Sequence, residues 1–173
     1  ASSCILCRRP NLRQFGTAVL IFVLLLLFVM REALPHLSTH FLGGAEGDPG
    51  LYIWLAKTNQ RDLFSLPWFD SRAFYPYGYS LAWSDNFILP SFVIAFFQKI
   101  GFGFTSAYNL TILGAHLLNG ICVFLLVFQL SAALFPAIAA GWFAMLFPFL
   151  YAQVGHAQLQ FVFVITVSLI AYF

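Results

Sequence analysis

The sequence contains no aspartate, glutamate, lysine or arginine from Ile100 to Phe173. Such a segment is unstable in water, because it would expose its apolar side chains there. Hydrophobic residues make up 61% of the chain and charged residues 8%, whereas about 25% of residues are charged in a typical soluble domain. We therefore predict an integral membrane protein. Eight basic and six acidic residues nearly balance, which excludes the clustered basic face of a nucleic-acid-binding protein.

The apolar runs predict an all-α polytopic helix bundle with about four spans, since a helix needs about 20 apolar residues to cross a bilayer. The expected order is a basic leader at 1–14, span 1 at 15–34, span 2 at 106–130, span 3 at 132–152 after a tight turn at 129–131, and the start of span 4 at 161–173. The last run is too short to cross. We therefore expect the chain to be the N-terminal part of a larger protein.

Most of the charge lies in residues 35–86, interpreted as an extracytoplasmic loop with juxtamembrane helices. The positive-inside rule puts the arginine-rich leader, and so the N-terminus, in the cytoplasm. Residues 87–100 are apolar but short, and we interpret them as a re-entrant or interfacial segment. The polar break at 153–160 then lies on the same side as the loop. If residues 87–98 did span, the polar break at 153–160 and the loop at 35–86 would lie on opposite sides of the membrane.

Asp48 is the strongest catalytic candidate, within the glycine-rich stretch at 43–50. A carboxylate at a membrane surface, flanked by glycines that allow close approach, can act as a general base. The alternative is that Asp48 caps a helix over about 49–59 that starts at Pro49. Glu46 could join Asp48 to hold a divalent cation, or it could be an ordinary exposed loop residue.

Other polar residues are candidates for substrate binding. His156 and Gln158, with Gln160, could hold a phosphate or a sugar hydroxyl, or could simply be solvated at the membrane interface. Asp85 could cap the 87–100 segment or help to build the site.

Cations are few in this chain, so Arg72 and Lys57 could hold a phosphate. Arg72 could instead pair with a neighbouring aspartate.

His116 and Asn119 lie three residues apart in the second span and share a helix face. Polar groups there usually face the bundle interior, so we expect hydrogen bonds between helices. Cys4 and Cys7 form one C-x-x-C pair without a second pair to complete a zinc site, and Cys122 is expected to serve in packing.

Four strings, in this order, resemble those of uncharacterised bacterial membrane proteins of the GT-C superfamily of polytopic glycosyltransferases. They are Gly47–Tyr52 (GDPGLY), Phe74–Gly78 (FYPYG), Leu81–Asp85 (LAWSD) and Gly155–Leu159 (GHAQL). The basic leader, the first span and the long loop with an early aspartate add to the resemblance. It implies a location in the bacterial inner membrane and a polyprenyl-phosphate-linked sugar donor.

The resemblance also implies roles for individual residues. Asp48 would deprotonate an acceptor hydroxyl while the lipid phosphate leaves, with inversion at the anomeric carbon. The substrate-binding candidates are Glu46, Tyr52, Arg72, Tyr75, Asp85, His156 and Gln158. Some members of the superfamily use a divalent cation such as Mg²⁺ or Mn²⁺ and others use none, so a metal is left open. The alternative function is a non-catalytic accessory or scaffold subunit of a larger membrane complex, with partner membrane subunits.

Overall fold

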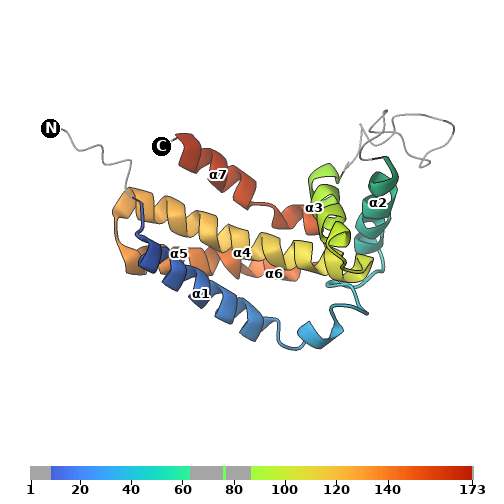
Figure 1. The fold of residues 1–173 in the computed structure, drawn as a ribbon, viewed down its shortest axis with the longest axis horizontal. Coiled ribbons are helices and arrows are strands. Elements are labelled where there is room, and N and C mark those ends of the chain that lie inside the picture. Colours follow the sequence, from blue (N-terminus) through green and yellow to red (C-terminus); the bar gives the residue numbers. More distant parts are fainter. Residues whose placement is uncertain (1–8, 63–75, 77–86, 173) are drawn as a thin grey trace. The chain divides into compact units, whose positions relative to one another are not determined.

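The computed structural model describes residues 9–62, 76 and 87–172, and all the regular secondary structure of these residues is helical (Figure 1). The all-α class predicted from the sequence is thereby confirmed for the described part. The elements are α1 (Leu12–Val29), the 3-10 helix η2 (Leu34–His36), α2 (Asp48–Asp62), α3 (Ile88–Lys99), α4 (Phe104–Ser131), α5 (Leu134–Met145), α6 (Pro148–Ala152), the 3-10 helix η4 (Ala157–Gln160) and α7 (Phe163–Tyr172). The candidate residues Arg72, Tyr75 and Asp85 lie outside the described residues.

Three helical segments of the described chain are long and apolar enough to cross a membrane. They are Leu12–Val29, Phe104–Ser131 and Leu134–Ala152. Two shorter apolar segments, Ile88–Lys99 and Ala157–Tyr172, fall below the length of a span. These features are those of an integral membrane protein.

The chain forms two compact units. Unit 1 comprises Ala1–His36, Ile112–Val154 and Leu159–Phe173, and unit 2 comprises Leu37–Thr111 and Gly155–Gln158. Each unit is described separately below.

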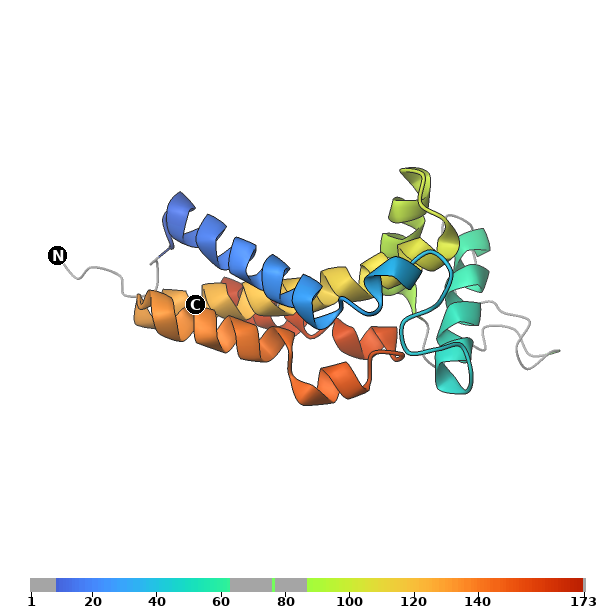
Figure 2. The ribbon, with the colours of Figure 1, turned by 90° about the horizontal axis from the view of Figure 1, so that it is seen from below.

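In unit 1, α1 lies against α4 and α5 (Figure 2). The buried residues Ala18, Phe22 and Leu26 recur every four positions, so they form one face of α1. The Phe22 ring meets Phe124 of α4 edge to face at 6.2 Å. A Cβ atom built on Gly141 of α5 would lie 2.5 Å from Phe22 Cζ. The absence of a side chain at position 141 therefore lets the helices approach closely, as the small-residue pattern predicts.

Helix α1 begins earlier than the apolar run suggests, because a capping box starts it. The Asn11 side chain accepts a hydrogen bond from the Gln14 amide at 2.9 Å, and the Gln14 side chain accepts one from the Asn11 amide at 3.0 Å. These bonds satisfy amides that a helix start leaves without partners. The helix therefore begins at Leu12.

The segment expected as one span at 132–152 differs from the prediction at two points. Helix α4 continues through Ser131, and the chain reverses at Ala132, which has a positive φ of 54°, so the tight turn expected at 129–131 is wrong. The run is also divided into α5 and α6, with Pro148 at the start of α6. A proline cannot donate its amide to a preceding turn, so it interrupts one helix and begins the next.

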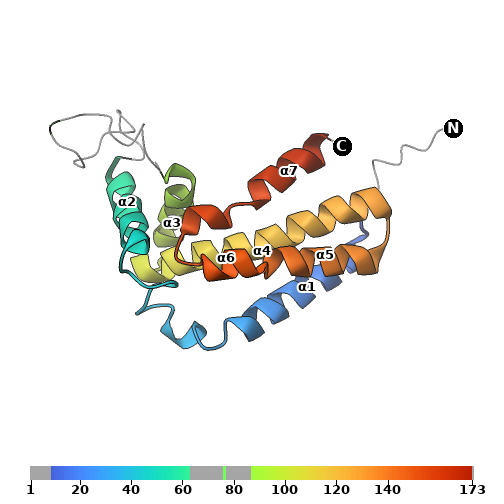
Figure 3. The same cartoon turned by 180° about the vertical axis from the view of Figure 1, so that it is seen from behind.

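In unit 2, α2 and α3 lie side by side (Figure 3). Asn59 of α2 donates a hydrogen bond to the Ser91 hydroxyl of α3 at 3.1 Å, and that hydroxyl donates to the Phe87 carbonyl at 2.6 Å. The Tyr52 ring stacks on Phe87 at 5.5 Å. These contacts fix α2 against the start of α3.

The first turns of α4 hold the loop at 37–42 within unit 2. The fully buried Asn109 donates hydrogen bonds to the carbonyls of Leu37 and His40, at 2.9 and 2.7 Å. Its side-chain oxygen accepts one from the Leu42 amide at 2.9 Å. Beside it the buried Tyr108 meets the Phe41 ring edge to face at 5.4 Å. The loop that leads to the glycine-rich stretch is thus anchored to α4.

Candidate functional site

The glycine-rich stretch turns directly into α2. The Gly47 carbonyl accepts the first helical hydrogen bonds, from the amides of Gly50 at 3.1 Å and Leu51 at 3.4 Å. Asp48 is therefore the first residue of the helix and does not occupy the cap position before it, so the expected boundary is wrong by one residue. Gly47 has a φ of +64°, which glycine adopts without strain.

The Asp48 carboxylate faces a residue from the other end of the chain. His156 Nε2 lies 3.4 Å from Asp48 Oδ2, across 108 residues of sequence and within unit 2. A carboxylate oxygen can only accept, so the imidazole N–H donates to it. The Asp48 side chain is 75% exposed and that of His156 25% exposed. The carboxylate is thus both held by a partner and open to another molecule.

Two contacts set the place of His156. Its ring meets the Tyr52 ring at 5.6 Å, and Tyr52 is itself buried against Phe87. The preceding residue, Gly155, lies so close to the start of α2 that a Cβ atom there would be 2.7 Å from Pro49 Cγ. The imidazole is therefore fixed by a ring on one side and by close backbone packing on the other.

The remaining predicted site residues differ in their surroundings. Glu46 is exposed in the loop just before α2. Gln158, two residues after His156, has a buried side-chain oxygen without a hydrogen-bond partner in the described part of the chain. Lys57 lies over the Phe104 ring at 5.0 Å, a cation–π contact. Tyr52 and His156 are the candidates found together at the start of α2, around Asp48.

Gln160 does not belong to the polar group expected at 156–160. It is fully buried in unit 1, where its side-chain nitrogen donates to the carbonyls of Leu150 and Gln153, at 3.1 and 2.7 Å. Gln160 therefore stabilises the turn between α6 and α7. Sequence spacing alone could not separate it from His156, because both lie in the same short polar break.

His116 and Asn119 hydrogen-bond between helices, as predicted. His116 Nδ1 donates to the Met145 carbonyl at 2.9 Å. Asn119 donates to the Gln160 carbonyl at 2.9 Å and accepts from the Phe163 amide at 2.6 Å. The Asn119 side chain thereby holds the start of α7 against α4.

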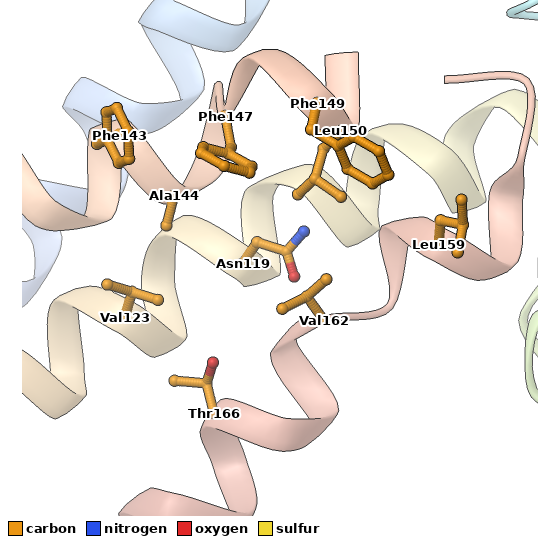
Figure 4. A pocket seen from close by; sticks show the side chains of 10 residues that line it. All are labelled: Asn119, Val123, Phe143, Ala144, Phe147, Phe149, Leu150, Leu159, Val162 and Thr166. Atoms are coloured by element: carbon orange, nitrogen blue, oxygen red, sulfur yellow. The ribbon is translucent and has the colours of Figure 1, made fainter. Parts of the chain in front are cut away.

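An apolar cavity of about 410 Å³ lies within unit 1, near Asn119 (Figure 4). It is lined by Asn119, Val123, Phe143, Ala144, Phe147, Phe149, Leu150, Leu159, Val162 and Thr166. The Asn119 amide is already engaged by backbone groups. The cavity therefore suits a hydrocarbon chain better than a sugar.

The sequence leaves open whether Mg²⁺ or Mn²⁺ binds. Such ions take several oxygen ligands, and no group of three His, Cys, Asp or Glu side chains able to hold a metal occurs within residues 9–62, 76 and 87–172. Asp48 and His156 supply two donors.

No protein-family model, curated protein or solved structure matches this chain.

Proposed function

We propose that the chain carries the general base of a membrane glycosyltransferase, and that this base is Asp48. The sugar donor would be a polyprenyl-phosphate-linked sugar, and transfer would take place at the extracytoplasmic face of a bacterial inner membrane, with the N-terminus in the cytoplasm. The contact between the Asp48 carboxylate and His156 carries this proposal. The resemblance of four strings to the GT-C superfamily supplies the reaction type.

The contact contributes little to stability, because the Asp48 side chain is 75% exposed and water can replace His156 as its partner. Asp48 is also not required as a helix cap, since the Gly47 carbonyl takes the first hydrogen bonds. A structural role therefore accounts poorly for an exposed carboxylate with an imidazole partner from a distant segment. Such a pair is typical of acid–base chemistry.

In the proposed step, the acceptor oxygen attacks the anomeric carbon of the donor from the face opposite the phosphate. Asp48 Oδ1 takes the hydroxyl proton while Oδ2 keeps its hydrogen bond from His156. The bond between the anomeric carbon and the phosphate oxygen breaks, and its electron pair leaves with the lipid phosphate. The configuration at the anomeric carbon is inverted.

One further feature supports a hydroxyl-bearing substrate. The buried side-chain oxygen of Gln158 has no partner in the described part of the chain, and a substrate hydroxyl could donate to it. An unsatisfied buried acceptor costs about 1–3 kcal/mol, so a ligand that satisfies it gains binding energy.

Replacing Asp48 by asparagine tests the proposal. The amide keeps the shape and loses the basic oxygen, so the rate of sugar transfer should fall by about a hundredfold or more. The assay uses membranes containing the full protein and a set of radiolabelled polyprenyl-phosphate hexoses and pentoses. Glu32→Gln makes the same chemical change at an exposed loop carboxylate paired with Arg31, and should leave transfer unchanged.

Full activity in Asp48→Asn would rule out the assignment. The alternative is an accessory or scaffold subunit of a larger membrane complex. That function predicts co-purification at a fixed ratio with other membrane subunits and no effect of Asp48→Asn.

A further inference from the structure

Asn109 connects α4 to the loop at 37–42 within unit 2. Its amide makes three hydrogen bonds, all to backbone groups between Leu37 and Leu42. The residue is fully buried, and a variant without the amide leaves these backbone groups without their side-chain partner. Asn109 therefore fixes the path of the chain up to Leu42.

The next residue, Gly43, carries that constraint to the segment before His156. A Cβ atom on Gly155 would lie 3.2 Å from the Gly43 carbonyl oxygen and 3.4 Å from its Cα. Gly43 has a φ of 81°, so its backbone conformation is one that glycine adopts readily. The anchored loop thus forms one wall of the space that holds Gly155.

The start of α2 forms the other wall. The same Cβ atom would lie 2.7 Å from Pro49 Cγ, the ring next to Asp48. Proline is stiff and begins the helix, so an added methyl group at position 155 must displace the 155–158 segment. Such a displacement separates His156 from Asp48.

We propose that Asn109 and Gly155 are positioning residues that hold the His156 imidazole in contact with the Asp48 carboxylate. Neither touches the reacting atoms. The effect on catalysis rests on the proposed function, whereas the effect on geometry does not. The two can therefore be tested separately.

The geometric test is a chemical cross-link between positions 48 and 156. Asp48 and His156 are both replaced by cysteine in the full protein, and Cys4, Cys7 and Cys122 are replaced by alanine. A short bis-methanethiosulfonate then joins the two thiols in native membranes, and the intact mass distinguishes a bridge from two separate adducts. The rate of bridging reports how often the two side chains are in contact.

Asn109→Ala and Gly155→Ala are each added to this cysteine pair. Loss of a buried hydrogen-bonded group costs about 1–3 kcal/mol, so we expect each change to slow bridging by about tenfold. The matched controls lie on α4 in unit 1. Asn119→Ala removes a similarly buried amide that bonds to backbone, and Gly114→Ala adds a methyl group with no atom within 4 Å. Both controls should bridge at the rate of the cysteine pair alone.

Three results would overturn the proposal. One is a cysteine pair that does not bridge at all. Another is bridging at an unchanged rate in Gly155→Ala. This variant tests the proposal even if Asn109→Ala does not fold. The third is an equal loss in Asn119→Ala, which would show that general destabilisation is the cause.

Sugar transfer is then measured for Gly155→Ala with Asp48 and His156 in place. Slow bridging together with a fall in kcat supports both proposals. Slow bridging with normal transfer supports the positioning and shows that transfer does not require the contact between His156 and Asp48, which is the observation that carries the proposed function. If bridging is unchanged in Gly155→Ala and transfer is lost in Asp48→Asn, the positioning proposal is wrong and the proposed function stands.

Discussion

Gly141 of α5 is a position where the addition of one methyl group should measurably destabilise unit 1. A Cβ atom there would lie 2.5 Å from Phe22 Cζ, 2.6 Å from the Gly120 carbonyl oxygen and 3.1 Å from Phe124 Cβ. The Phe22 ring can rotate, but the Gly120 oxygen belongs to helix backbone. The two helices must therefore move apart to accept an alanine.

Overpacking of this kind costs about 1–3 kcal/mol. Replacing glycine by alanine inside a helix gains up to about 1 kcal/mol in propensity. The net free energy of unfolding of Gly141→Ala should therefore fall by up to about 2 kcal/mol. For a chain of this length, that corresponds to a fall of several degrees in the melting temperature, at about 2–4 °C per kcal/mol.

Gly114→Ala in α4 provides the matched comparison, because a Cβ atom there meets no atom within 4 Å. This variant keeps the gain in propensity without the clash, so it should melt at or above the temperature of the unchanged protein. The assay is thermal unfolding of the purified protein in detergent, followed by circular dichroism. If Gly141→Ala melts as high as Gly114→Ala, the close approach of α5 to α1 and α4 is wrong.

Two more predictions concern the site and the cavity. Gly50→Ala would bring a Cβ atom to 2.5 Å from the Ala45 carbonyl oxygen and displace the loop before Asp48, so sugar transfer should fall more than tenfold. The control is Gly103→Ala, because a Cβ atom there has open space around it. Equal activity in the two variants would contradict the prediction. Ala144→Phe should fill part of the cavity of about 410 Å³. The variant should therefore retain less prenyl lipid on purification, measured by native mass spectrometry, without a lower melting temperature. An undiminished amount of bound lipid would show that the cavity does not bind prenyl lipid.

The helical class could be predicted because it depends on composition and local patterning. A long apolar run without charge favours a helix in a bilayer, because a helix makes all its backbone hydrogen bonds within the segment, so the runs containing Phe22 and Phe124 predict helices directly. The start of α1 was missed because Asn11 and Gln14 form a capping box in a polar leader. The proline at position 148 indicates a break in the helix, but the apolar character of the run favoured the prediction of one continuous span.

The site could be predicted only in part, because it depends on contacts between distant segments. Asp48 and His156 were each identified as polar residues in a nearly uncharged chain, and their proximity followed only if residues 87–98 do not span. Nothing local in the sequence distinguishes Asn109 from other asparagines, since its three backbone partners lie 67 to 72 residues away. Gly155 likewise has no sequence signal for its contact with Pro49.

The separation of 108 residues between Asp48 and His156 also determines when the site can form during synthesis. Helices α1 to α5 are all synthesised before His156 is added, so the Asp48 carboxylate has no partner until the later segment follows. Contacts between such distant residues are slow to form, because a long loop must close first. A chain that stalls or is cleaved before Gly155 would retain Asp48 but lack the completed pair. Correct assembly is therefore coupled to translation and insertion of the later segments.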